Sequence, residues 1–140
     1  AVDDPDIAHA MAEAVAAVAP DLHYIALAGA KGQTMTRAAK ALGLKIGNEA
    51  FPDRAYTPSG NLQSRQEPGA VIQDPRHVAD RALQMVLDEC VTANDGTVIP
   101  LQADTLCVHG DTPAAVTLAK NIRRALEKEG VVLSSIPADH

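Results

Sequence analysis

The sequence predicts an α/β fold with parallel strands, and three observations support this prediction. Apolar runs typical of strands alternate with amphipathic stretches typical of helices along the 140 residues. Strands that are separated by helices usually pair in parallel through right-handed crossovers. Apolar residues make up 46% of the chain and aromatic residues only 2%, so the predicted core consists of small aliphatic side chains. The length is that of one domain or of a piece of one.

The first fifty residues predict helix, strand, helix and strand. Either Asp3 or Asp6 can cap the first helix. The predicted elements are a helix to about Val18, a strand over 22–28, a turn over 29–33, a helix over 34–42 and a strand over 44–51. Residues 29–36 hold two glycines and a lysine but lack the spacing of a Walker loop, so we predict a structural turn there.

The rest of the chain predicts a long polar connection followed by a helix, a hairpin and a strand–helix–strand sequence. Asp74 as the cap and Pro75 as the first helical residue make the next helix the clearest of the chain. Its apolar stripe leaves five polar residues on the outward face: Arg76, Asp80, Arg81, Gln84 and Asp88. The other predicted elements are the polar connection over 52–70, a hairpin around 94–96, a strand over 105–109, a helix from Thr112 and Pro113 to Gly130, and a short strand over 131–135.

Side-chain alternation in two strands favours part of a β/α barrel over a doubly wound sheet, although both satisfy the pattern. In the strands over 44–49 and 105–109, one face is aliphatic and the other is small or polar. On this geometry Glu49 and His109 emerge at the carboxyl ends of their strands and point inward. Catalytic residues of α/β barrels usually lie at that end.

Composition limits the partners and the location. A formal charge of −6 argues against nucleic acid as a partner, and no apolar run is long enough to span a membrane. Cys90 and Cys107 lack metal-binding spacing, so we expect reduced thiols in the cytoplasm. The chain opens without Met and almost at once with a helix, as a C-terminal piece of a longer protein would.

His109, Gly110 and Asp111 follow the third predicted strand directly. An imidazole at a strand end has no packing task, whereas it can move a proton or bind a metal. Asp111 by itself is better explained by capping, since either it or Thr112 can cap the next helix. Gly110 permits a tight turn or the close approach of a ligand.

A second group of polar residues lies between Gly47 and Arg65. It holds Glu49, Asp53, Arg54, Tyr56 and Arg65. A polar connection this long in a compact domain usually forms a lid, a binding loop or a disordered segment. Arginines there can hold a carboxylate or a phosphate, and Phe51 and Tyr56 are expected to anchor the loop.

Two segments resemble the lactam-utilisation (LamB/YcsF) family, also named as the A subunit of 5-oxoprolinase: NEAFPDRAYTPSGNLQSRQEPGAVI and DTLCVHGDTPAAV. The family's block Glu-x-Phe-x-Asp-Arg-x-Tyr, followed by Gly-x-Leu, an Arg and Gly-Ala-Val-Ile, falls on Glu49, Phe51, Asp53, Arg54, Tyr56, Gly60, Leu62, Arg65 and 69–72. The block Cys-Val-His-Gly-Asp-Thr falls on 107–112. Pro52 replaces the family's Ala.

The resemblance covers only the C-terminal part of the family's longer chains. It implies the later half of a distorted, TIM-like barrel of the polysaccharide-deacetylase type. The family's front blocks, Asn-Ala-Asp, Gly-Phe-His-Ala-Gly-Asp and Lys-Pro-His-Gly-Ala, lie outside the match. The missing N-terminal half of the barrel is therefore an expected partner, and the isolated chain need not be active.

The implied activity is the ATP-dependent opening of a small-molecule lactam, 5-oxoproline, to L-glutamate, together with subunits B and C. ATP is bound by this chain or by a partner, and a metal is left unassigned. We predict catalytic roles for His109, Asp111 and Glu49. The predicted substrate-binding residues are Asp53, Arg54, Tyr56, Arg65 and Gly110.

Two other functions fit the same residues. A metal-dependent amide or acetyl hydrolase on the same barrel type would need neither ATP nor partner subunits. His109, Asp111 and Glu49 could contribute ligands to it, but they form no compact ligand triplet in the sequence. A non-catalytic half-barrel that only docks onto other chains is the third possibility.

Overall fold

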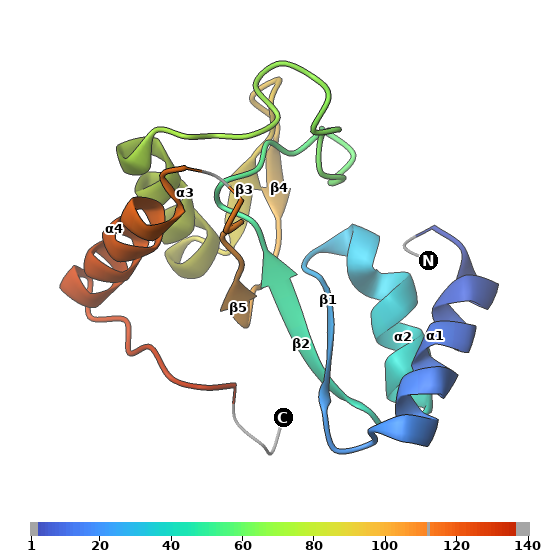
Figure 1. Ribbon diagram of the computed structural model, residues 1–140. Helices are drawn as coiled ribbons and strands as arrows, with labels where there is room; N and C mark the ends of the chain where they lie inside the picture. Colours follow the sequence, from blue (N-terminus) through green and yellow to red (C-terminus); the bar gives the residue numbers. More distant parts are fainter. Residues whose placement is uncertain (1–2, 112, 137–140) are drawn as a thin grey trace.

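The structure, a computed structural model, describes residues 3–111 and 113–136 and is a mixed α/β arrangement (Figure 1). In chain order its elements are α1 (Pro5–Val18), β1 (His23–Leu27), the short 3-10 helix η1 (Ala30–Gly32), α2 (Gln33–Ala41), β2 (Lys45–Ala50), α3 (Pro75–Leu87), β3 (Cys90–Thr92), β4 (Val98–Pro100), β5 (Thr105–Leu106) and α4 (Ala115–Lys128). The predicted α/β class and most of the predicted elements are confirmed.

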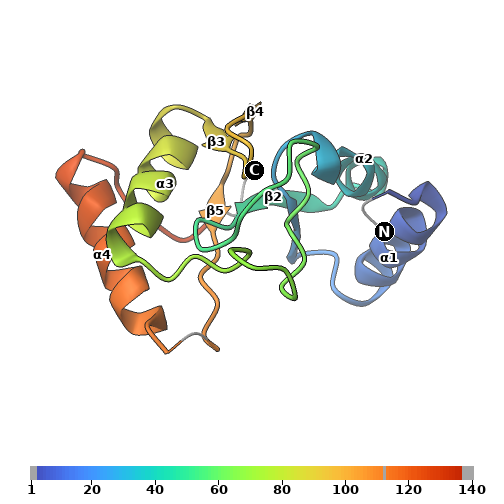
Figure 2. The same cartoon turned by 90° about the horizontal axis from the view of Figure 1, so that it is seen from above.

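A three-stranded parallel sheet in the order β1-β2-β5 forms the centre of the molecule, as the alternation of strands and helices predicted. The register pairs Leu27 with Glu49 and Glu49 with Thr105. The α1–α2 and α3–α4 helix pairs lie at opposite ends of the molecule with the sheet between them (Figures 1 and 2). The second sheet is the antiparallel β3–β4 hairpin, which confirms the predicted turn around 94–96.

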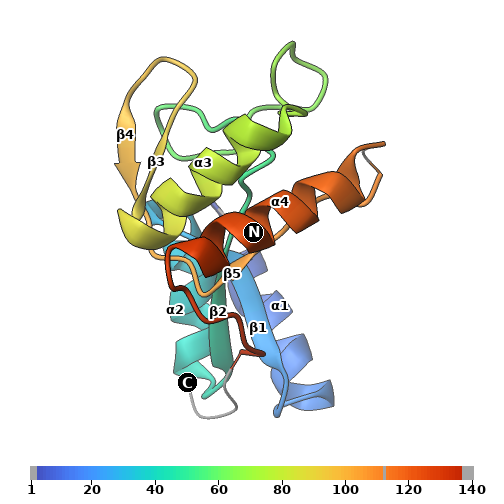
Figure 3. The ribbon, with the colours of Figure 1, turned by 90° about the vertical axis from the view of Figure 1, so that its left-hand side faces the viewer.

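Small aliphatic residues fill the core, as the composition predicted. One cluster joins α1 and α2 to β1 through Ala12, Tyr24, Ala26, Ala39 and Leu44. A second cluster holds α3 against α4 through Val78, Ala82, Leu118, Ile122 and Leu126, and these two helices lie side by side in Figure 3. The third cluster lies beneath the loop after β2 and contains Ala28, Ala50, Tyr56, Met85, Val91 and Leu101.

Local signals at the ends of elements agree with the structure, with one shift. Asp74 accepts a hydrogen bond from the main-chain N–H of His77 at 2.8 Å and caps α3 as predicted. Asp4, rather than Asp3 or Asp6, caps α1, because its side chain accepts from the N–H groups of residues 6 and 7. A Cβ at Gly32 would lie only 1.6 Å from the Leu27 carbonyl oxygen, so the close approach of two main-chain segments accounts for this glycine.

The predicted strand over 105–109 is wrong beyond Leu106. Cys107 still donates its N–H to the Ala50 carbonyl at 2.9 Å, but β2 ends at Ala50 and the chain then leaves the sheet. A strand needs a partner along its whole length. His109 therefore finds its hydrogen bonds outside the sheet.

The C-terminal region departs from the prediction in two places. Helix α4 begins at Ala115, later than predicted, and its cap, Ala114, makes no side-chain hydrogen bond; Thr112 lies outside the described residues. Residues 131–135 form no strand. Val131 instead donates to the Leu126 carbonyl, which ends α4, and the Val132 side chain is 87% exposed with no strand beside it among the residues described.

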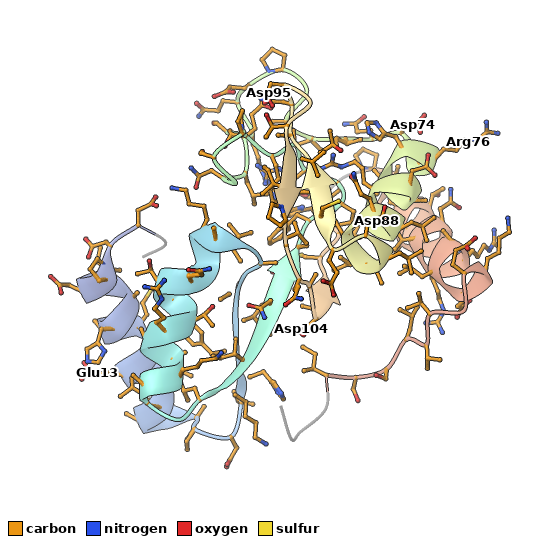
Figure 4. The ribbon with its side chains drawn as sticks, turned by 180° about the vertical axis from the view of Figure 1, so that it is seen from behind. Glu13, Asp74, Arg76, Asp88, Asp95 and Asp104 are labelled. Atoms are coloured by element: carbon orange, nitrogen blue, oxygen red, sulfur yellow. The ribbon has the colours of Figure 1, made fainter. Side chains whose placement is uncertain are left out.

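Helix α3 exposes fewer polar residues than predicted. Arg81 is 7% exposed and Gln84 is half-buried, because both reach main-chain or side-chain groups of β3. Arg76 extends away from the molecule, as predicted (Figure 4). None of the helices in the described part of the chain combines the length and apolar character that a membrane crossing requires.

Candidate functional site

The centre of the candidate site is a histidine held by a buried aspartate. His109, just after β5, lies with its ring Nδ1 2.9 Å from Oδ2 of Asp53, in the loop after β2. The His109 main-chain N–H donates to the same oxygen, also at 2.9 Å. Asp53 is fully buried, whereas the His109 side chain is 21% exposed. A carboxylate only accepts, so Nδ1 carries the proton and Nε2 is the nitrogen that can exchange a proton with a ligand.

The aromatic residues of the loop fix the histidine ring from another direction. Phe51 stacks on His109 with ring centroids 5.5 Å apart and an interplanar angle of 19°. The Phe51 main-chain N–H donates to the hydroxyl of Tyr56 at 3.0 Å, and Tyr56 is almost completely buried. The predicted anchoring of the loop by these two residues is therefore present in the structure. Figure 1 shows the loop arching above the carboxyl end of β2.

Glu49 lies at the same end of the sheet as His109. Burial raises the pKa of Glu49, and the nearby His109 lowers it by a smaller amount. Cys107, between β5 and His109, also has a raised pKa, caused first by burial and then by the charges of Glu49 and Asp53. The structure thus brings Glu49, Asp53 and His109 within electrostatic reach of one another. Cys107 is a neutral thiol at this site and is not activated as a nucleophile.

Arg65 and Asp111 connect the loop to the segment that carries His109. Their side chains form an ion pair of 2.8 Å at the surface, and Arg65 holds the pKa of Asp111 below its usual value. An exposed pair of this kind contributes little to stability and exchanges readily with other ions. The predicted capping by Asp111 is absent, because α4 begins four residues later. Gly110 is exposed, and a Cβ there would meet no atom within 4 Å.

Arg54 is buried and already occupied. Its Nη2 donates to the Gln63 carbonyl at 2.6 Å and its Nε to the Ala70 carbonyl at 3.3 Å. Burial is the main cause that lowers its pKa, followed by the charge of Arg65. The side chain closes the loop on itself, so Arg54 differs from the exposed Arg65, which remains able to meet a ligand.

Arg81 is the residue of this region that the sequence interpretation missed. Its guanidinium reaches the loop from α3 and contacts the main chain on both sides of Asp53. The helical pattern had placed it outward, yet Val78, Arg81 and Met85 share one helical face at spacings of three and four. That spacing was the available signal, because Val78 and Met85 are both buried.

No group of three His, Cys, Asp or Glu side chains with metal-ligand geometry occurs within residues 3–111 and 113–136. At the η1 turn, the contact with Leu27 accounts for Gly32, as expected for a structural turn. The described residues do bring together an imidazole, His109, and the two carboxylates of Asp53 and Glu49.

Fold and site together define an α/β protein with an aspartate-held histidine at the carboxyl end of a parallel sheet. The chain belongs to the LamB/YcsF family, whose model matches residues 1–139, and this confirms the resemblance drawn from the sequence motifs.

Known relatives agree with this assignment. The chain is 46% identical over 133 residues to the A subunit of 5-oxoprolinase from Natranaerobius thermophilus, covering 95% of this chain and 51% of the relative. It is 43% identical over 134 residues to the A subunit of 5-oxoprolinase from Rhodopseudomonas palustris, covering 96% and 52%. The crystal structure of a lactam utilization protein from Thermus thermophilus superimposes with a TM-score of 0.82 at 42% identity, covering 94% of this chain and 51% of that one. The chain spans about half the length of the curated relatives it matches.

Proposed function

We propose that the chain is the C-terminal half of the A subunit of a 5-oxoprolinase, which opens 5-oxoproline to L-glutamate in an ATP-dependent reaction together with subunits B and C. The names of the relatives support the substrate and the existence of partner subunits. The observation that carries the proposal is the 2.9 Å contact between the buried Asp53 and the partly exposed His109. Two free thiols, Cys90 and Cys107, fit a cytoplasmic location.

The chemical difficulty of the reaction is the lactam carbonyl, which is a poor electrophile. ATP supplies a phosphoryl group that would activate the carbonyl oxygen. We assign ATP binding to another part of the complex, because the η1 turn is explained by packing and the guanidiniums of Arg54 and Arg81 are occupied by main-chain carbonyls. This chain would supply the groups that handle protons and the substrate carboxylate.

His109 is the proposed general base. Its Nε2 would take a proton from the attacking water, and Asp53 would stabilise the imidazolium formed. Glu49, whose pKa is raised by burial, would donate as the general acid to the departing ring nitrogen. The balance would close with two waters. The first adds its oxygen to the carbonyl carbon as the ring C–N bond breaks, and its protons pass by way of these two groups to the new amine. The second releases the phosphoryl group from the resulting acyl phosphate as inorganic phosphate, and ADP remains from ATP.

The other predicted site residues take supporting roles in this proposal. Arg65 would exchange its exposed partner Asp111 for the substrate carboxylate. The buried Arg54 and Tyr56 would hold the loop, and Gly110 would leave room for the ligand. Asp53 becomes a positioning residue, because none of its surface is exposed to a substrate.

We also propose that the chain forms half of a distorted β/α barrel and docks onto the other half. Within the described residues β1 and β5 each pair only with β2, so both edges of the sheet are open. Beside β5 lies a cavity of about 560 Å³, with Leu106, Val108 and Ile122 in its lining. Open edges next to apolar surface are typical of a sheet that continues into another segment.

The test is His109→Ala in a reconstituted complex that contains this chain extended to the full length of its relatives. Loss of a general base lowers kcat by about 100-fold or more. The control is His9→Ala, at an exposed position of α1, which should keep wild-type glutamate formation. Normal turnover of His109→Ala would remove His109 from the mechanism. Activity that needs no ATP and disappears with a chelator would favour the metal-dependent hydrolase.

A further inference from the structure

Arg81 is a buried cation whose guanidinium spreads over three main-chain carbonyls. Its Nε donates to Pro52 at 3.0 Å, its Nη2 to Arg54 at 2.8 Å and its Nη1 to Thr92 at 3.0 Å. The first two acceptors stand on either side of Asp53. The side chain is 7% exposed and comes from α3, an element that contains none of the proposed catalytic residues.

The segment that Arg81 binds, residues 52–54, is not stabilised by a helix or a strand ladder of its own. Residues 52–54 lie outside every helix and strand. The carbonyl of Asp53 itself accepts from the Ile72 N–H at 2.9 Å. Three successive carbonyls are therefore engaged, two of them by one planar guanidinium, so the main chain that carries the Asp53 side chain is restrained. Lysine, with a single ammonium group, cannot reproduce this fork.

A purely structural role, the docking of α3 on β3, leaves two of these bonds unexplained. Gln84, one turn further along α3, already joins the two elements: its side chain donates to the Thr92 hydroxyl at 2.9 Å and accepts from the Thr92 N–H at 3.2 Å. Burial lowers the pKa of Arg81, while the charges of Tyr56 and Asp53 oppose that effect. The Asp53 carboxylate thus lies close enough to compensate part of the buried positive charge.

We propose that Arg81 is a positioning residue for His109, acting through the 52–54 main chain and the Asp53 carboxylate. This inference rests on the proposed function, in which His109 is the acid–base group. The three hydrogen bonds of the Arg81 guanidinium go to main-chain carbonyls, so its effect on His109 is indirect. Its effect is to hold Asp53 where one oxygen can accept from both the ring and the main chain of His109.

The test compares Arg81→Lys with Gln84→Ala by NMR on the ¹⁵N-labelled chain. In the wild type at alkaline pH, long-range ¹H–¹⁵N spectra should show the neutral His109 ring as the Nδ1–H tautomer. Arg81→Lys should show a mixture of both tautomers, whereas Gln84→Ala should keep the wild-type pattern. In the complete complex, Arg81→Lys should lower kcat by about 10- to 100-fold with little change in KM, because the group is misplaced and binding is intact.

Unchanged tautomer and kcat in Arg81→Lys would overturn the proposal, and so would the same change in Gln84→Ala. If Arg81→Lys does not fold, a hydrogen-exchange measurement on the wild-type chain tests the restraint instead. The Arg81 Nε–H should then exchange with solvent far more slowly than that of Arg76, whose side chain extends outward from α3 (Figure 4); equal rates would reject the restraint. The tautomer of His109 can be measured without turnover. The tautomer result therefore tests the role of Arg81 even if the proposed reaction proves wrong.

Discussion

Two neighbouring regions of the molecule bury their main chain in different ways. In the unit from β1 through α2 to β2, residues 23–50, strand ladders and one helix satisfy most main-chain groups, and small aliphatic side chains fill the space between them. In the loop over 51–72, residues 52–56 are all buried but form only isolated bridges. There, the side chains of Arg54, Tyr56 and Arg81 complete the hydrogen bonding.

This difference shows which interactions fix the positions of the side chains in the candidate site. A ladder distributes its hydrogen bonds over many residues, so no single polar side chain controls it. The loop concentrates them on a few buried polar groups, and each lost partner leaves a buried donor or acceptor unsatisfied. His109 depends on the second kind of structure. The substitutions below are ways to measure how far the two regions differ.

The largest effect on stability is expected for Asp53→Ala. The substitution removes the acceptor of both the His109 ring and its main-chain N–H, and it removes a negative charge that opposes the effect of burial on Arg81. Removal of one partner from a buried charged network costs about 3–5 kcal/mol. Urea denaturation should show this loss in the free energy of unfolding. Asp111→Ala, at the exposed end of the same site, should leave stability unchanged. Similar losses in the two variants would contradict the contrast between buried and exposed carboxylates.

A smaller effect on stability is expected when each of two buried tyrosines is replaced by Phe. The two tyrosines lie in the two regions, so the substitutions compare them directly. Tyr56→Phe removes the hydroxyl that accepts from the Phe51 N–H, at a cost of about 1–2 kcal/mol. The hydroxyl of Tyr24, on β1, is buried and meets no hydrogen-bond partner among the described residues. Tyr24→Phe should therefore be neutral or stabilise by up to about 1 kcal/mol, since it removes an unpaired polar atom. Thermal and urea unfolding of both variants measure the difference; equal destabilisation would show that the loop is no more dependent on its polar groups than the sheet.

The sequence predicted most helices and turns well because their signals are local. Asp74 and Pro75 start α3, and Asn94 to Gly96 turn the hairpin, through contacts within a few residues. The strand after residue 104 was predicted too long because strand length depends on the partner. β2 ends at Ala50, a fact of tertiary structure that the 105–109 pattern does not contain.

For the candidate site, the sequence singled out residues that the structure brings together, but it did not indicate which of them pair. The predicted strand ends placed Glu49 and His109 at the carboxyl end of the sheet. The family motif drew attention to Asp53. The bond between Asp53 and His109 joins positions 56 residues apart, and no periodicity indicates it. Arg81 was harder still, because it binds main-chain carbonyls, which every residue has. Its spacing from Val78 and Met85 indicated a buried face of α3, but nothing in the sequence indicated which carbonyls it binds.

The smallest predicted effect on stability concerns Glu49, which lies near the end of β2, just before the loop over 51–72. Burial raises its folded-state pKa above the usual 4.5, so the folded chain binds this proton more tightly than the unfolded chain. The stabilising contribution is complete below that usual value and disappears as the pH rises through the folded-state pKa. Glu49→Gln should therefore match the wild type in acid and become slightly more stable than it at neutral pH, as urea midpoints at both pH values would show. Glu67→Gln, exposed in the loop, serves as the control and should change neither midpoint.

His109 sharpens this last comparison, because its charge lowers the pKa of Glu49 against the effect of burial. In a His109→Ala background that opposing effect is gone, and the pKa of Glu49 should rise further. The neutral-pH gain from Glu49→Gln should then be larger than in the wild type. A gain of the same size in both backgrounds would mean that Glu49 and His109 do not sense each other, and the proposed division of acid and base between them would fail. A larger gain would show that Glu49, at the end of the β1–β2 ladder, is coupled to His109, the ring that Asp53 and Phe51 of the loop hold in place.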